Sequence, residues 1–161
     1  MPQLSDALAT PPESHGIVQV VCCGSYARGE ASEQSDIDYV IVFDNTETAP
    51  DLRERVRSEI CSIVPNGPSE DGAFGKPFSR NEILANIGGN VDSNKNITRR
   101  ILLLLEGEWL FNKDGLRGFR REILDCYIGE GMTDHQLALF LLNDIIRYYR
   151  SGRLRVQNFR E

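Results

Sequence analysis

Two short apolar runs rich in β-branched residues, joined by a polar loop, constrain the fold of this chain most strongly. Residues 17–22 have the sequence IVQVVC and stop at a Gly-Ser pair, and residues 37–43 have the sequence IDYVIVF. Runs of this length and composition are typical of buried strands. A proline then opens a segment, residues 50–63, in which apolar side chains recur at helical spacing. Strand, turn, strand and amphipathic helix in succession predict an α/β unit.

The remainder of the chain has a mainly helical pattern, with one short exception. Residues 73–78 are expected to form an edge strand, because Pro77 excludes a central position in a sheet. Helical segments are expected over residues 81–87, 97–111, 115–128 and 134–150. Together these patterns predict an α/β (α+β) fold in which a small mixed β-sheet with flanking helices is followed by a C-terminal helical bundle.

The length of the chain fits one domain. Its 161 residues, 40% of them apolar, are enough to bury an ordinary core. The expected organisation is an N-terminal arm or short helix at residues 1–15, a core at 16–92, a C-terminal helical segment at 93–150 and a basic tail at 151–161.

The charge balance narrows the classes of partner. With 18 basic against 24 acidic side chains, the net charge is −6, which disfavours a general nucleic-acid or membrane coat. The longest apolar run, residues 101–105, is far too short to span a bilayer, and the first residues lack the pattern of a signal peptide. No two of the four cysteines have C-x-x-C spacing, so we expect free thiols. These features predict a cytoplasmic protein without a membrane segment.

The loop between the two predicted strands carries the residues that indicate chemistry. Gly24 and Ser25 follow a buried strand directly, where backbone N–H groups can face a phosphate. Gly29 is expected to allow a close approach between loop and strand. Asp36 and Asp38 are two residues apart at the next strand, so their carboxylates are expected on the same face.

Two neighbouring carboxylates repel one another unless a cation lies between them. The cation that fits best is a hard divalent ion such as Mg²⁺, which is held by oxygen ligands together with substrate phosphates. The segment from Gly24 to Asp38 therefore predicts a site for a metal ion and a phosphorylated ligand.

The pattern G-S-Y-A-R-G-E-x₄-S-D-I-D resembles the signature of the DNA polymerase β-type nucleotidyltransferase superfamily. Within that superfamily, the chain is most similar to bacterial protein nucleotidylyltransferases of the uridylyltransferase kind, which modify nitrogen-regulatory proteins. A weaker likeness follows in the segment DGAFGKPFS, residues 71–79, and in residues 96–111. The resemblance covers roughly residues 17–112.

The resemblance implies a nucleotidyltransferase core that transfers a nucleoside monophosphate from an NTP to a hydroxyl group. Gly24 and Ser25 would hold the β- and γ-phosphates, and Asp36 and Asp38 would bind catalytic Mg²⁺ or Mn²⁺. The third carboxylate would be Asp71, with the adjacent Glu70 as the alternative. Ser35 is implied as a phosphate or nucleotide contact.

Several questions stay open at this stage. The acceptor is either a protein or a small molecule such as an antibiotic, and a second-messenger synthase is a further alternative. A chain whose third carboxylate does not reach the D-x-D pair would instead be a nucleotide-binding regulatory partner, for example an antitoxin-like one. The sequence names neither the base of the NTP nor the oligomeric state. Candidate cations for the triphosphate are Lys76, Arg80, Arg99 and Arg100, although basic residues on helices are usually only solvated.

Overall fold

The computed structural model describes residues 17–44, 50–64, 66–67, 77–85, 87, 92–128, 133 and 139–150. Its elements in chain order are β1 (Ile17–Cys23), α2 (Gly24–Arg28), β2 (Asp38–Phe43), α3 (Pro50–Ile63), β3 (Phe78–Ser79), α4 (Arg80–Leu84), α5 (Asn94–Leu105), β4 (Glu108–Phe111) and α6 (Lys113–Ile128). A further helix spans residues 139–150. None of the helices in these ranges is both long enough and apolar enough to cross a bilayer.

The four strands form one mixed sheet in the order β3-β2-β1-β4. Strand β1 pairs antiparallel with both β2 and β4, whereas β2 pairs parallel with β3. The predicted mixed sheet with flanking helices is therefore confirmed. Strand β3 stands at an edge of the sheet, as expected, but it spans only Phe78–Ser79, and residues 73–76 of the expected strand lie outside the described residues.

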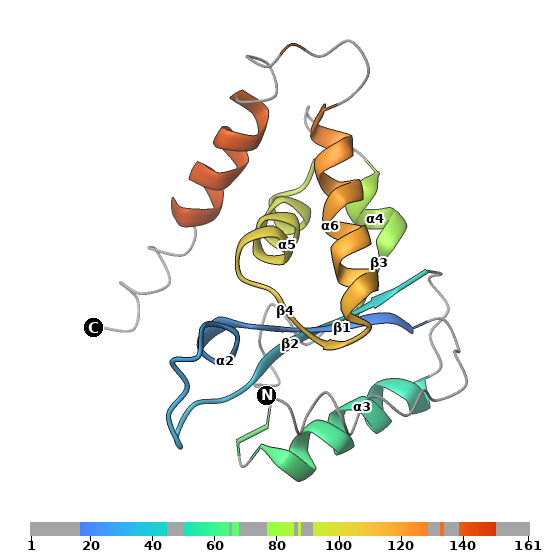
Figure 1. Ribbon diagram of the computed structural model, residues 1–161, viewed down its shortest axis with the longest axis vertical. Coiled ribbons are helices and arrows are strands. Elements are labelled where there is room, and N and C mark those ends of the chain that lie inside the picture. The colour runs from blue at the N-terminus through green and yellow to red at the C-terminus, as the bar shows by residue number, and fades with distance from the viewer. Residues whose placement is uncertain are drawn as a thin grey trace.

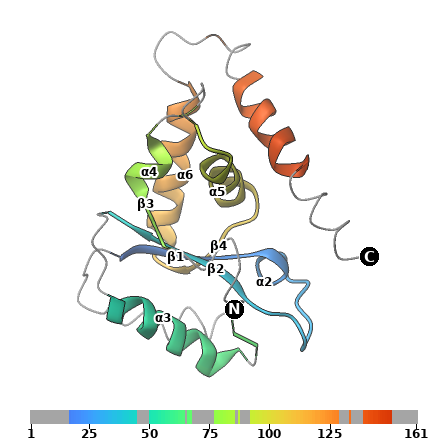
Figure 2. The same ribbon diagram turned by 180° about the vertical axis from the view of Figure 1, so that it is seen from behind.

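Helices cover both faces of the sheet. Helix α3 lies on one face, and α4, α5 and α6 lie on the other (Figure 1; Figure 2 gives the opposite view). Alternate residues of each central strand point to opposite faces, so Cys22 packs on the α3 side and Cys23 on the other side. Because both faces are covered, β1 and β2 can be almost continuously apolar.

The cluster on the α3 side joins the two central strands to one stripe of α3. Its buried members are Val20, Cys22, Ile37, Tyr39, Ile41, Phe43, Val56, Ile60, Val64 and Leu110. The members Val56, Ile60 and Val64 recur every four residues, which places them on one face of the helix. The predicted helix over residues 50–63 is confirmed, and this stripe is the reason that it packs on the sheet.

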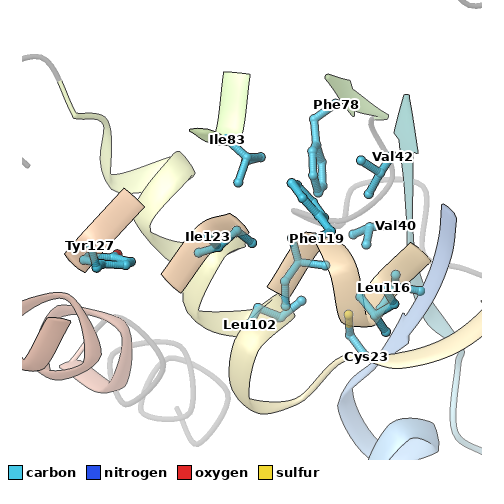
Figure 3. Close-up of a cluster of buried hydrophobic side chains, with 12 residues drawn as sticks. Cys23, Val40, Val42, Phe78, Ile83, Leu102, Leu116, Phe119, Ile123 and Tyr127 are labelled. Carbon is cyan, nitrogen blue, oxygen red and sulfur yellow. The ribbon is translucent and has the colours of Figure 1, made fainter. Parts of the chain in front are cut away.

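The cluster on the other face is larger and centres on α6 (Figure 3). Its buried members are Val21, Cys23, Val40, Val42, Phe78, Ile83, Leu102, Leu103, Leu116, Phe119, Ile123 and Tyr127. Asn112 accepts a hydrogen bond at 2.9 Å from the backbone N–H of Gly115 at the start of α6. The helix expected over residues 115–128 is thus confirmed as a continuous helix of 16 residues, which has a capping side chain and a full apolar stripe.

The expectation of one helix over residues 97–111 was wrong. Helix α5 ends at Leu105, and residues 108–111 form β4, which pairs with β1. The turn between them packs tightly, because a Cβ on Gly107 would lie 2.8 Å from Cγ1 of Val21. A short apolar run that is buried on all sides has no period that separates a strand from a helix. Trp109, expected on a helix, lies on β4 and packs against the α6-side cluster.

The helix of residues 139–150 contacts the body of the protein through one face. The part of the expected helix before residue 139 lies outside the described residues. Phe140 of this helix is 46% exposed, whereas Asp144 is only 6% exposed. Asp144 accepts a hydrogen bond from Tyr127 of α6 at 2.6 Å, and Arg147 donates one to Asn94 of α5 at 2.7 Å. Leu141 and Tyr148 also pack against the α6-side cluster, so the inward face of this helix combines apolar packing with polar contacts.

Candidate functional site

The Gly-Ser turn is the point where β1 becomes α2 without any intervening residue. Gly24 has a φ of +67°, a conformation that residues with a Cβ rarely adopt. A Cβ on Gly24 would lie 2.9 Å from Oδ2 of Asp38. Both the backbone angle and the close carboxylate therefore require glycine, and Ser25 follows in the first turn of α2.

Asp38 is the first residue of β2 and stands opposite Cys23 in the antiparallel register. Its neighbours Ile37 and Tyr39 are both buried in the cluster on the α3 side. Because side chains alternate along a strand, Asp38 projects to the other face, toward the Gly-Ser turn. Asp36 precedes the strand and is exposed. The structure thus brings Gly24 and Asp38 together, whereas Asp36 lies on the surface two residues before β2 begins.

Gly29 ends α2 in a left-handed conformation with a φ of +71°. The backbone N–H of Glu30 donates to the carbonyl of Ser25 at 2.8 Å, which closes the helix end in the way that glycine commonly permits. The sequence predicted a close approach at Gly29, and this was wrong among the described residues, because a Cβ there would meet no atom within 4 Å. Glycine is required at this position by the backbone angle alone.

Ser35 organises the loop that leads into the D-x-D segment. Its hydroxyl accepts a hydrogen bond from the backbone N–H of Ser32 at 2.9 Å and lies 3.1 Å from the Ser32 hydroxyl. The backbone N–H of Ser35 donates to the carbonyl of Ser32 at 3.1 Å. These bonds close a short turn just before Asp36, so the position of Ser35 fixes where the D-x-D segment begins.

The two cysteines at the end of β1 are buried free thiols. Both are at most 1% exposed. Burial raises the pKa of Cys22 to about 12, with a further contribution from the charge of Asp38, and burial likewise raises the pKa of Cys23. Both thiols are therefore protonated at neutral pH, the form in which a cysteine is a weak nucleophile.

Arg100, a candidate cation for the triphosphate, is 0% exposed and has a structural role. It pairs with Asp92 and donates a hydrogen bond to the hydroxyl of Tyr127 at 3.2 Å. Asp144 lies 3.7 Å from the same guanidinium group. A fully buried and paired arginine does not contact a ligand, so the prediction for Arg100 was wrong.

Two other candidate cations are also held within the layer of helices. The guanidinium group of Arg99 lies 4.4 Å from the ring centre of Phe78, and this residue is 4% exposed. Burial lowers the pKa of Arg99. Arg80 pairs with Glu122 of α6. Lys76, the fourth candidate, lies outside the described residues.

An oxygen-ligand metal site fits the carboxylates of the D-x-D segment. The expected third carboxylate, Asp71, and its alternative, Glu70, lie outside the described residues. The residues that are described contain no group of three or more His, Cys, Asp or Glu side chains able to hold a metal ion. One or two carboxylates are nonetheless the protein contribution typical of Mg²⁺ bound with substrate phosphates. The carboxylate oxygens of Asp36 and Asp38 are ligands of this type.

An ion pair that the sequence did not predict ties α2 to the end of α5. Arg28, the last residue of α2, donates to Oε2 of Glu106 at 3.0 Å and to Oε2 of Glu30 at 2.8 Å. Both bonds raise the pKa of the Arg28 guanidinium, with the larger contribution from Glu30. Arg28 and Glu106 are 78 positions apart in the sequence, and no local pattern indicates such a pair.

A mixed sheet between two layers of helices, with a Gly-Ser turn set against an aspartate, is consistent with the nucleotidyltransferase core that the motifs implied. The family model described as nucleotidyltransferase domain matches residues 2–114, and the chain belongs to this family. The resemblance drawn from the G-S and D-x-D motifs is thereby confirmed at the level of the domain family. None of the curated proteins compared with this chain matches it.

One solved structure is similar to this chain over most of its length. It is described as the crystal structure of a toxin-antitoxin with AMP-PNP, and it is 14% identical. The similarity covers 90% of this chain and 94% of that chain, with a TM-score of 0.41. At these values the likeness establishes neither a shared fold nor a shared function.

Proposed function

We propose that this protein is a metal-dependent nucleotidyltransferase that moves a nucleoside monophosphate from an NTP to a hydroxyl acceptor and releases pyrophosphate. The observation that carries the proposal is the contact between Gly24 and Asp38, which joins the Gly-Ser turn to the D-x-D segment. Membership of the nucleotidyltransferase domain family supports it. The acceptor oxygen would attack the α-phosphorus while the bond to the β-phosphate breaks.

Each residue of the site has a separate task in this proposal. Asp36 and Asp38 would hold Mg²⁺ or Mn²⁺, and Gly24 and Ser25 would hold the phosphates through the backbone of the turn. The cations, when bound, neutralise the charge that develops on the attacking and leaving oxygens. Ser35 would position the D-x-D segment through the turn that it closes with Ser32, in addition to any contact with the nucleotide.

We retain Asp71 as the third carboxylate, which would accept the proton of the acceptor hydroxyl. Phe78 stands opposite Val42 in a parallel pair, so the chain comes to β3 from the end of the sheet where β2 begins. Asp71 precedes Phe78 by seven residues, and Asp36 precedes Val42 by six. Seven residues reach up to about 24 Å when extended, so the chain is long enough for Asp71 to reach Asp36.

The first experiment measures nucleotide binding, which needs no acceptor. Thermal shift and calorimetry with each of the four NTPs, with and without Mg²⁺, should show metal-dependent binding by the wild-type protein. The double variant Asp36→Ala/Asp38→Ala should lose it. Asp114→Asn is the matched control, because its carboxylate is 93% exposed on α6 and pairs only weakly, at 3.8 Å, with Arg117.

The second experiment measures transfer. Radiolabel from each α-labelled NTP should appear on an acceptor, and comparison of the four bases tests the uridylyltransferase-like resemblance. A wild-type protein no more active than Asp36→Ala/Asp38→Ala would refute the catalytic proposal. Metal-dependent binding without transfer would instead favour the nucleotide-binding regulatory role. Label on a protein fraction would identify a protein acceptor, and label on a small molecule would identify an antibiotic-type or second-messenger reaction.

A further inference from the structure

Glu106 contacts two elements that are far apart in the sequence. One carboxylate oxygen, Oε2, accepts a hydrogen bond from Arg28 of α2 at 3.0 Å. The other, Oε1, accepts one from the hydroxyl of Tyr148 at 2.6 Å. Tyr148 belongs to the helix of residues 139–150. The Glu106 carboxylate therefore connects α2 with the last described helix of the chain.

The backbone that carries Glu106 is held firmly in place. Arg120 of α6 donates to the carbonyl of Leu103 at 2.7 Å and also to the carbonyl of Gly107. Gly107 packs so closely on β1 that a Cβ there would lie 2.8 Å from Cγ1 of Val21. The side chain of Glu106 is only 21% exposed. Glu106 is therefore a fixed point against which α2 is placed.

Helix α2 is so short that Arg28 at its end is only about one turn from the Gly-Ser pair at its start. It begins with Gly24 and Ser25 and ends at Arg28, a length of five residues. The side chain of Arg28 is 46% exposed and has a second partner, Glu30, in the loop that follows α2. Of these two pairs, only the pair with Glu106 connects α2 to the body of the protein.

The helix of residues 139–150, which carries Tyr148, is also anchored to the body of the protein, so its position determines whether Tyr148 reaches Glu106. Tyr148 follows Asp144 by four residues, on the same face of the helix. Asp144 is bound to Tyr127 in the buried network around Arg100. Docking of residues 139–150 on α5 and α6 therefore brings the Tyr148 hydroxyl to Glu106, and undocking would remove it.

We propose that Glu106 is a positioning residue for the phosphate-binding turn, and that docking of the helix of residues 139–150 sets nucleotide affinity through Tyr148 and Glu106. This regulation rests on the nucleotidyltransferase function proposed above. Tyr148 fixes the carboxylate so that Oε2 faces Arg28, and Arg28 holds α2. Loss of either contact releases the turn that would bind the phosphates, without any change in the carboxylates of the D-x-D segment.

The test uses the full chain and the variants Glu106→Gln and Tyr148→Phe. Calorimetry with Mg²⁺ and the NTP preferred by the wild-type protein should show affinity weakened by about fivefold or more in each variant. Hydrogen exchange without nucleotide should be faster at the N–H groups of Gly29 and Glu30, which bond within α2. Exchange in α6 should be unchanged, which separates a local effect from general destabilisation.

Two comparisons test the route of the effect. Glu30→Gln is the matched control, because it removes the other carboxylate partner of Arg28, which is 62% exposed and stays within the loop. It should leave the affinity nearly unchanged. The effects of Arg28→Gln and Glu106→Gln should not add in the double variant, because Glu106 acts through Arg28.

Each outcome decides either the inference or the function on which it rests. Unchanged affinity and exchange in both Glu106→Gln and Tyr148→Phe would overturn the inference, as would an equal loss in Glu30→Gln. If the wild-type protein binds none of the four NTPs, the proposed function fails. In that case, the hydrogen-exchange rates of the Gly29 and Glu30 N–H groups still test whether Glu106 holds α2.

Discussion

Gly24 and Asp38 are packed against one another so closely that a Cβ on Gly24 would lie 2.9 Å from a carboxylate oxygen of Asp38. Gly24 directly follows the end of β1, where Cys23 stands opposite Asp38, the first residue of β2. The glycine thus fixes the position of a carboxylate as well as the turn of the backbone. This makes it a sensitive point of the proposed site.

Substitution Gly24→Ala should impair metal-dependent nucleotide binding more than it impairs folding. The left-handed backbone angle of +67° costs a residue with a Cβ about 1–2 kcal/mol. The added Cβ also displaces the Asp38 carboxylate, which weakens metal and nucleotide binding. Denaturant unfolding measures the first effect, and calorimetry with NTP and Mg²⁺ measures the second.

Gly29→Ala provides the comparison for this prediction. Gly29 has a similar backbone angle, +71°, but a Cβ there meets no described atom within 4 Å. Both variants should therefore lose similar stability, while binding should fall further in Gly24→Ala. Equal losses of binding in the two variants would show that backbone strain alone is responsible and that the contact with Asp38 has no role.

The identity of the third carboxylate is open to a direct test. We expect Asp71→Asn to reduce transfer by about 10²–10⁴-fold, the usual contribution of a group that moves a proton in the transition state. Nucleotide affinity should change much less, because Asp36 and Asp38 remain. Initial rates with saturating NTP measure the effect.

Glu70→Gln is the control for Asp71→Asn, since it removes the neighbouring carboxylate. A large loss in Glu70→Gln, with Asp71→Asn near the wild-type rate, would exchange the two assignments. Near-wild-type rates in both variants would exclude either residue as the third carboxylate.

The parts of the fold that sequence patterns predicted are those with regular burial. Residues of β1 and β2 are buried on both sides by helices, so apolar β-branched runs mark them. Helix α3 has one apolar stripe, which helical spacing reveals. The Gly-Ser turn and Asp38 were also predicted in position, because a turn after a buried strand needs glycine and the next strand returns beside it.

The parts that were missed depend on contacts between distant segments. Strand β4 forms because Gly107 permits close packing on Val21 and the next residues pair with β1, and no neighbouring residue encodes that pairing. Arg100 looks like an exposed helical cation until Asp92 and Asp144 surround it from two other segments. Glu106 was not singled out for the same reason. A charged residue that is buried by distant partners leaves no local periodicity.

Arg100→Leu should destabilise the protein strongly. The substitution removes the cation between two buried carboxylates, those of Asp92 and Asp144. Breaking a buried pair by removing one partner typically costs about 3–5 kcal/mol. Arg117→Leu is the control, because its guanidinium is 70% exposed, and it should change the free energy of unfolding by about 0.5 kcal/mol or less.

Denaturant unfolding at neutral pH measures both arginine variants. If Arg100→Leu were as stable as Arg117→Leu, the buried network would not hold the helix of residues 139–150 in place. The network would then be a consequence of packing around α5 and α6, and not a cause of it.

Tyr127 should make the protein less stable in alkali. Burial raises the pKa of its hydroxyl above the ordinary value of 10, and the bond to Asp144 raises it further, although Arg100 opposes both effects. Above pH 10 the unfolded chain loses this proton before the folded chain does, so the folded state binds more protons. Stability is therefore fully present below pH 10 and falls as the pH rises, by up to about 1.4 kcal/mol per pH unit for this group.

The variant Tyr127→Phe separates this residue from the other groups that titrate in the same range, such as Tyr148. At pH 8 the variant should be less stable than the wild-type protein, because Asp144 loses its 2.6 Å hydrogen bond. Between pH 10 and 12 its free energy of unfolding should fall less steeply, so the two curves approach one another. Unfolding in urea at pH 8, 10, 11 and 12 measures both curves. Parallel curves across this range would contradict the prediction, because Tyr127 would then ionise equally easily in the folded and unfolded chains.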